Sequence, residues 1–192
     1  MPDLTGKLGV AGPFTGVHNN ALIVAGGANF PEGVPWRPTT EGYNSPKVYY
    51  DTIDVITSDG DGYKVVTSET KLPQVIGYGV SIPTKDGVIC IGGEWKENVR
   101  DEAAKKYDSS MHLSAKVFML SHDNGDITLD NNFPDLPEGT TAASGVLVGD
   151  KIYIAGGDSG EGATKNFWAL DLAKRGSDDF KWESKKPWDG RA

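Results

Sequence analysis

The chain has 192 residues, of which 38% are hydrophobic and 24% are charged, with 25 glycines, 11 prolines and a formal net charge of -8. An acidic protein of this kind is repelled by the phosphates of nucleic acids and by anionic membrane surfaces. No stretch approaches the roughly 18 consecutive apolar residues of a membrane-spanning helix. We therefore expect a turn-rich globular protein with neither a nucleic-acid partner nor a membrane partner.

The N-terminal segment MPDLTGKLGV has no basic start followed by an apolar core, so it does not resemble a signal peptide. This favours a cytoplasmic location. If a leader has been removed from the sequence, the protein is instead periplasmic or secreted.

Cysteine and histidine are too scarce for a disulfide framework or a typical metal site. The single cysteine, Cys90, lies between two isoleucines and is expected to be a buried small hydrophobe. The three histidines, His18, His112 and His122, include no pair four residues apart. We therefore expect no metal and no other cofactor, and we expect His122, beside an Asp-Asn-Gly turn, at the surface.

In chain order, the first strong pattern is an apolar run that ends in two glycines, and it occurs three times. The pairs begin at residues 26, 92 and 156, so they are spaced 66 and 64 residues apart. Pro73 and Pro137 each precede the next pair by 19 residues, and Pro187 opens a similar stretch. Regular spacing of this length indicates repeated structural units.

Each unit is predicted to contain four short antiparallel strands. Two strands joined by a tight turn lead into each glycine pair, and the turns are Asn19-Asn20, Lys85-Asp86-Gly87 and Gly149-Asp150-Lys151. The first two strands are expected at 79–82 and 88–91 in the second unit, and at 144–148 and 152–155 in the third. Third strands are expected at 52–56, 117–120 and 167–172, and fourth strands at 63–67, 127–129 and 180–183.

Four-stranded units at this spacing predict an all-β fold built from propeller blades. The expected boundaries are about 8–70 for blade 1, 71–134 for blade 2 and 135–186 for blade 3, with a further blade starting at 187–192. A closed propeller typically has about four to eight blades. Three blades would leave two faces open, so we expect association with a second copy or with a separate half-propeller.

The glycine pair, followed by an aromatic residue in a later strand (Trp168, Trp182), resembles the Kelch repeat. The stretches AGPFTGVHNNALIVAGGANFP, YYDTIDVI and LPQVIGYGVSIPTKDGVICIGGE resemble the cyclically permuted branch of the N-acetylneuraminate epimerase (sialic acid mutarotase) family. The resemblance covers residues 8 to 192. It implies half of a six-bladed Kelch propeller, because family chains are about twice as long, and an isomerase that interconverts the anomers of N-acetylneuraminate, a sugar acid.

The resemblance also implies a catalytic pair. The family places a glutamate and an arginine six residues apart after the glycine of one blade, and Glu94 and Arg100 match this order after Gly92-Gly93. Opening and reclosing a sugar ring needs a general acid/base, here Glu94, and a cation for the sugar carboxylate, here Arg100. The family's own pair can fall in a blade beyond residue 192, so this pair is either the motif or its repeat-equivalent. The alternative is a surface salt bridge of little consequence.

Other candidate residues come from loops. The long loop 28–47 offers Asn29, Phe30 and Arg37 as substrate-binding residues, although Phe30 can instead pack against the next blade. Arg191 occupies a position at which family blades often carry an arginine near the channel. In the second long loop, 96–112, the sequence DEAAKK is a possible short helix with solvated charges.

Two further interpretations stay open beside a mutarotase-like isomerase. A non-catalytic Kelch module would bind a carbohydrate or a protein through the same loops, because propellers carry many functions. A chain of three blades would also be inactive until a second half completed the ring.

Overall fold

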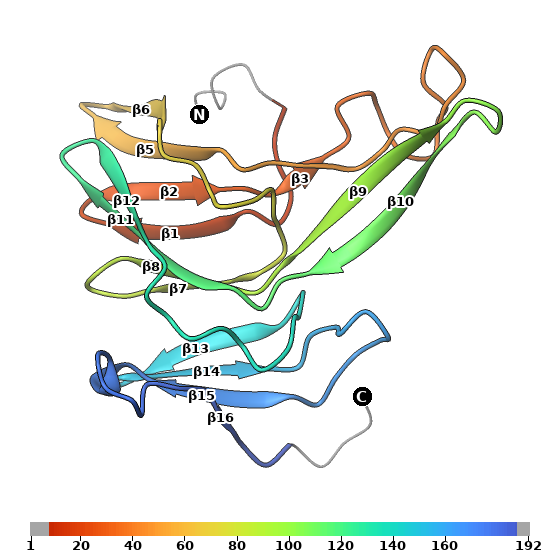
Figure 1. Cartoon of the computed structure of the whole chain (residues 1–192). Coiled ribbons are helices and arrows are strands. Elements are labelled where there is room, and N and C mark those ends of the chain that lie inside the picture. The colour runs from red at the N-terminus through yellow and green to blue at the C-terminus, as the bar shows by residue number, and fades with distance from the viewer. Residues whose placement is uncertain (1–7, 188–192) are drawn as a thin grey trace.

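The computed structural model describes residues 8–187. Twelve strands form three four-stranded antiparallel sheets in which the strands lie in chain order (Figure 1). The first sheet, blade 1, contains β1 (Phe14–His18), β2 (Ala21–Ala25), β5 (Ile53–Asp59) and β6 (Gly62–Thr67). Blade 2 contains β7 (Val80–Pro83), β8 (Val88–Ile91), β11 (Val117–Asp123) and β12 (Asp126–Asp130). Blade 3 contains β13 (Ser144–Val148), β14 (Lys151–Ala155), β15 (Phe167–Asp171) and β16 (Glu183–Ser184).

The three sheets match the repeated four-stranded unit that the sequence predicts. Differences lie at strand ends: β11 runs to Asp123 because Asn124 and Gly125, both at positive φ, complete a tight turn directly behind it. The last strand, β16, begins three residues later than the expected 180–183, is shorter, and lies at the rim of blade 3. The described helical structure is one 3₁₀ turn, Leu172–Lys174, so no helix within residues 8–187 has the length or apolarity to cross a membrane.

The glycine pairs are backbone links between consecutive blades. All six glycines have φ between 65° and 109°, a region that favours glycine. The N–H of Gly27 donates to the carbonyl of Ile76 at 2.8 Å, and the N–H of Gly93 donates to that of Thr140 at 2.8 Å. A Cβ on Gly92 would lie 2.7 Å from the Thr140 oxygen. Only glycine therefore lets the end of one blade approach the start of the next.

The core consists of two apolar layers between the blades. One layer joins blades 1 and 2 and the other joins blades 2 and 3. Side chains of β8 alternate between them, with Val88 and Cys90 in the first and Ile89 and Ile91 in the second. The expected burial of Cys90 is confirmed, and this burial raises the pKa of its thiol.

A short backbone ladder runs from blade to blade just before the innermost strands β1, β7 and β13 begin. The N–H of Tyr78 donates to Gly12 O at 2.7 Å, and the N–H of Ala142 donates to Tyr78 O at 2.9 Å. Gly12, Tyr78 and Ala142 all have positive φ, at 63°, 59° and 52°. Because only the first is a glycine, the sequence did not reveal this repeated position.

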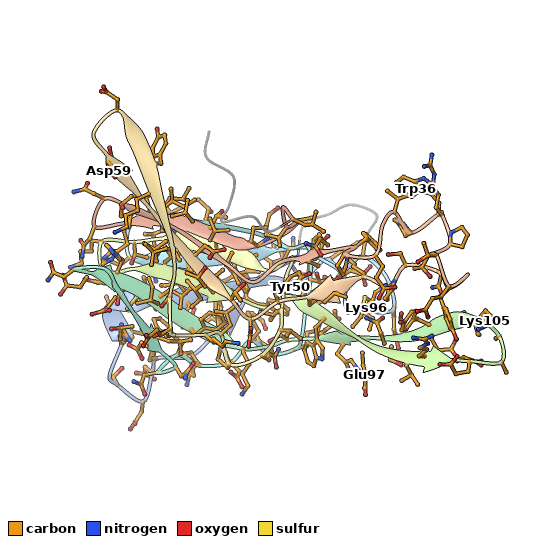
Figure 2. All side chains as sticks on the ribbon, turned by 90° about the horizontal axis from the view of Figure 1, so that it is seen from above. Trp36, Tyr50, Asp59, Lys96, Glu97 and Lys105 are labelled. Atoms are coloured by element: carbon orange, nitrogen blue, oxygen red, sulfur yellow. The ribbon has the colours of Figure 1, made fainter. Side chains whose placement is uncertain are left out.

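The segment after the second glycine pair is a long hairpin rather than a loop with a short helix. Strands β9 (Glu94–Asp101) and β10 (Lys106–Leu113) pair along their whole length. The Asp101 carboxylate accepts the N–H groups of Ala103 and Ala104, both at 3.0 Å, and so shapes the turn. Six residues are too few to hold an isolated helix, and pairing is the more stable use of this segment. Figure 2 shows the hairpin projecting, with Lys96 near its base and Lys105 at its tip.

The turns of neighbouring blades bury His122, which the sequence placed wrongly at the surface. The backbone N–H of His122 donates to His18 Nδ1 at 3.0 Å, and the side-chain Nε2 of His122 accepts from the backbone N–H of Gly125 at 3.2 Å. Asn19 adds a bond of 2.8 Å to the His122 carbonyl. The β1–β2 turn therefore covers the β11–β12 turn.

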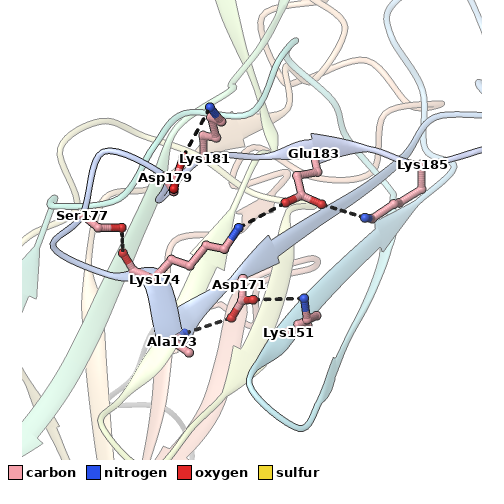
Figure 3. A network of polar contacts seen from close by, with 9 residues as sticks. All are labelled: Lys151, Asp171, Ala173, Lys174, Ser177, Asp179, Lys181, Glu183 and Lys185. Carbon is pink, nitrogen blue, oxygen red and sulfur yellow. Dashed lines mark hydrogen bonds and ion pairs between the residues drawn. The ribbon is translucent and has the colours of Figure 1, made fainter.

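The outer rim of blade 3 is held by side-chain contacts (Figure 3). Asp171 pairs with Lys151 at 3.0 Å and accepts the Ala173 N–H at 3.1 Å, and the contact with Lys151, followed by that with Ala173, lowers the pKa of its carboxyl. On the short strand β16, Glu183 pairs with Lys174 and Lys185 at 3.5 and 2.7 Å. These ion pairs supplement the few backbone bonds of β16.

Candidate functional site

The candidate residues of the described chain come from two connections that leave the blades at the same end. Figure 1 places β3 (Ala28–Asn29), β9 and β10 together at that end. The connection after β2 carries three candidates and the hairpin after β8 carries two: Asn29, Phe30, Arg37, Glu94 and Arg100. Arg191, the sixth candidate, lies outside the described residues.

Glu94, at the base of the hairpin, is the best enclosed of the charged candidates. Its Oε1 accepts a hydrogen bond from the Tyr49 hydroxyl at 2.5 Å and lies 3.8 Å from Lys47 Nζ. The Lys47 ammonium sits 3.9 Å from the centroid of the Tyr78 ring. The side chains of Glu94 and Lys47 are only 13% and 20% exposed. We call Glu94, Lys47, Tyr49 and Tyr78 the Glu94 cluster.

Burial, followed by the hydrogen bond to Glu94, raises the pKa of Tyr49 far above its usual range. Tyr49 is therefore protonated at ordinary pH, and its hydroxyl donates a hydrogen bond to the Glu94 carboxylate. A carboxylate beside a phenol and an ammonium can accept a proton and return it. The ammonium can also bind a carboxylate of a ligand. The cluster thus combines a proton-accepting group with a cation that can bind an anion.

Asn29 faces away from this cluster. In the short sheet of β3 and β4 (Val48–Tyr49), Asn29 pairs with Val48, whereas Tyr49 pairs with Ala28. Since alternate residues of a strand point to opposite faces, the Asn29 and Tyr49 side chains lie on opposite sides. The Asn29 amide instead accepts from the Tyr50 hydroxyl at 2.7 Å and donates to Gly9 O at 3.2 Å. It borders a separate cavity of about 370 Å³ at blade 1.

Phe30 and Arg37 do not join Glu94 either. Phe30 is half-buried, and the Arg37 side chain is exposed in the loop that follows β3. Beside it, Trp36 is 76% exposed. Figure 2 shows Trp36 standing out from the body of the molecule, on the side toward which the hairpin projects.

Arg100 lies near the far end of β9, in a second charged group. It pairs with Glu41 at 2.7 Å and with Glu102 at 3.0 Å, and its guanidinium stacks 4.2 Å above the Tyr43 ring. Six residues of extended strand at about 3.3 Å each separate Arg100 from Glu94 by roughly 20 Å. The structure therefore does not bring the predicted pair together. We call Arg100, Glu41, Glu102 and Tyr43 the hairpin-tip cluster.

Sequence reasoning missed Lys47, Tyr49 and Tyr78. Lys47 and Tyr49 are two residues apart, which in an extended segment puts their side chains on one face. That spacing was the available signal. Their approach to Glu94 depends on how β4 and β9 are placed in three dimensions, which no local pattern reports. Across residues 8–187, no three His, Cys, Asp or Glu side chains gather to hold a metal ion.

Three four-stranded meanders, packed face to face with their first strands innermost, define a β-propeller type of protein. A solved structure entitled "Structure of YjhT" shares this fold, with a TM-score of 0.58 over 93% of this chain and 46% of that chain, at 16% identity. The predicted all-β propeller fold is thereby confirmed.

Curated relatives are N-acetylneuraminate epimerases. The protein of Yersinia pestis (strain Pestoides F) is 36% identical over 105 residues, or 49% of this chain and 25% of the relative. That of Vibrio cholerae is 29% identical over 127 residues, or 59% and 26%. The chain thus spans about a quarter of the length of the curated relatives it matches. No family model matches. The resemblance to N-acetylneuraminate epimerases that the sequence predicts is confirmed.

Proposed function

We propose that this protein is a sialic-acid mutarotase-like isomerase that interconverts the anomers of N-acetylneuraminate. The observation that carries the proposal is the Glu94 cluster, in which an enclosed carboxylate contacts a phenol and an ammonium directly behind a glycine pair. The similarity to proteins named N-acetylneuraminate epimerase supplies the substrate class. The proposed ligand is therefore a small sugar acid.

In the proposed reaction, Glu94 takes the proton of the anomeric hydroxyl and returns it to the ring oxygen, as the bond between that oxygen and the anomeric carbon breaks. The resulting open-chain ketone rotates about the bond to its carbonyl carbon. The ring hydroxyl then adds to the other face of the carbonyl, and the proton transfers are reversed. No atom is gained or lost, so the reaction requires no co-reactant.

Lys47 replaces Arg100 in the role of holding the sugar carboxylate. It lies 3.8 Å from Glu94, whereas Arg100 is roughly 20 Å away along β9. Asn29, Phe30 and Arg37 stay candidates for contacts with the outer part of the sugar, from the connection that also carries Lys47. Self-association is part of the proposal.

A second candidate function is carbohydrate binding without catalysis. It is favoured by the exposure of Trp36 and by a hollow of about 440 Å³ lined in part by Tyr43, Arg100 and Tyr107. Exposed aromatic rings beside charged groups suit polyols. In this case the sugar would bind at the hairpin tip rather than at its base.

The test is the rate at which a freshly dissolved single anomer of N-acetylneuraminate equilibrates, followed by proton NMR. The wild-type chain should exceed the spontaneous rate, and Glu94→Gln should lower the catalysed rate by about 10²- to 10⁴-fold. Glu97→Gln, an exposed residue on the same strand, is the matched control and should retain the rate. A wild-type rate equal to that of buffer would refute the isomerase.

A further inference from the structure

The blades differ in how many of their faces are covered. Blade 2 is packed on both sides, whereas blades 1 and 3 each have one face without a neighbouring blade among residues 8–187. The open face of blade 1, here the leading face, comprises Val17, Leu22, Val24, Ile56 and Val65. The open face of blade 3, here the trailing face, comprises Val146, Tyr153, Ala155, Phe167 and Ala169.

The leading face carries an apolar row across the whole sheet. Val17 pairs with Leu22, Leu22 pairs with Ile56, and Ile56 pairs with Val65, so these four side chains lie on one side of blade 1. Val17 and Leu22 are 59% and 37% exposed. Solvent-facing strands normally carry polar residues at such positions, so this row fits a surface that is covered.

The trailing face has the same character. Val146 pairs with Tyr153, which pairs with Ala169, and the Tyr153 and Phe167 rings lie 5.9 Å apart. Val146 is 53% exposed. Both open faces are therefore apolar, although they belong to opposite sides of the wedge.

The repeat shows what each face is built to contact. Counted back from the glycine pairs, Leu22 and Val24 hold the positions of Val88 and Cys90 in blade 2 and of Ile152 and Ile154 in blade 3. Those four residues are fully buried against the preceding blade. Likewise, Tyr153 and Ala155 hold the positions of Ile23 and Ala25, which are buried against the following blade. The two open faces therefore correspond to the two sides of the blade–blade interface, which occurs between blades 1 and 2 and again between blades 2 and 3.

The backbone ladder through Gly12, Tyr78 and Ala142 also indicates that the two open faces are complementary. Each step is an N–H of one blade donating to a carbonyl of the blade before it, from Tyr78 to Gly12 and from Ala142 to Tyr78. Within the described residues, the Gly12 N–H donates to no carbonyl of this ladder, and the Ala142 carbonyl accepts from no N–H of it. The next step would join Gly12 N–H to an Ala142 carbonyl.

One position departs from the pattern. Asp54 on the leading face stands where blade 2 has Phe118 and blade 3 has Trp168. It is buried, and the Thr67 hydroxyl donates to its carboxylate at 2.6 Å. Because this carboxylate already accepts a hydrogen bond within blade 1, covering it does not leave that oxygen without a donor.

We propose that the partner of these faces is a second copy of this chain. The trailing face of each copy packs on the leading face of the other, so that one two-fold axis relates two identical interfaces and the ring closes. The three blades that residues 8–187 form in each copy give six, within the range of about four to eight for closed propellers. This arrangement does not depend on the isomerase activity.

The test is molecular mass by light scattering of the whole chain, with variants that place a charge in each face. The wild type should have twice the 20.5 kDa mass of one chain. Leu22→Glu and Val146→Glu should each give monomers with unchanged β-sheet circular dichroism. Val99→Glu, at a residue that is 60% exposed on β9 and outside both faces, should stay dimeric.

Mixing the two charged variants separates this arrangement from any other dimer. In a mixed pair, one interface joins the intact leading face of one chain to the intact trailing face of the other, and both charges fall in the second interface. The mixture should therefore dimerise more strongly than either variant alone. A monomeric wild type, a dimer unaffected by both substitutions, or the absence of rescue on mixing would each overturn the proposal.

Discussion

The two ends of the β9–β10 hairpin carry the same kinds of residue in opposite surroundings. At the base, Glu94 contacts Tyr49 and Lys47, and its side chain is 13% exposed. At the tip, Glu102 contacts Tyr43 and Arg100, and its side chain is 70% exposed. Each end thus has a carboxylate, a phenol and a cation. Tyr43 itself is buried, so the difference lies in the carboxylates: only at the base is the carboxylate shielded from water, which strengthens its contacts.

A matching spacing in the sequence does not by itself bring two residues into one site. Glu94 and Arg100 satisfy the expected order in the sequence, and an extended strand then carries them roughly 20 Å apart. The cation that meets Glu94 comes from another connection. The base should therefore account for chemistry and stability, while the tip should tolerate change.

The largest expected effect is the loss of stability from Gly92→Ala at the base. Its φ is 65°, and a Cβ would lie 2.7 Å from the Thr140 carbonyl. Strain and this contact together should cost about 3 kcal/mol of unfolding free energy, measured by urea denaturation. Ala103→Gly at the exposed tip should change it by no more than about 0.5 kcal/mol. Equal losses at the two ends would contradict the comparison.

The same substitution at each end gives a sharper test. Tyr49→Phe removes the hydroxyl that donates to the enclosed Glu94 carboxylate, so it should cost about 1–3 kcal/mol and lower the anomerisation rate. Tyr43→Phe removes the bond to the exposed Glu102, which water can replace, so it should cost less than about 1 kcal/mol. Thermal unfolding of both variants measures the difference, and the reverse order would place the stronger contact at the tip.

A smaller effect should appear at alkaline pH. The raised pKa of Tyr49 means that the folded state favours its protonated form. Its contribution to stability is fully present below the usual tyrosine pKa of about 10 and falls as the pH rises above that value. Wild-type stability should thus decline faster between pH 10 and 11 than that of Tyr49→Phe, as seen by urea unfolding. Equal declines in the wild type and in Tyr49→Phe would show that the folded state does not favour the protonated form of Tyr49.

Local patterns were sufficient for the blades and insufficient for the site. The glycine pairs, the tight turns and the alternation around Cys90 are short-range features, so the sequence predicts the three sheets and their order. The 94–113 hairpin was missed because its polar, charged strands lack a buried face and so lack the alternation that marks a strand. Lys47 meets Glu94 only through the placement of β4 beside β9. The positive φ of Tyr78 is likewise set by neighbouring blades.

The most direct test of whether the sugar binds at the base of the hairpin is the KM for N-acetylneuraminate of two matched variants, Lys47→Met and Arg100→Met. Both remove a cation and keep a long apolar side chain. If the sugar carboxylate binds at the Glu94 cluster, Lys47→Met should raise the KM by about tenfold or more, and Arg100→Met should leave it within about twofold. A raised KM for Arg100→Met, with Lys47→Met unchanged, would contradict the account and move the binding site to the hairpin tip.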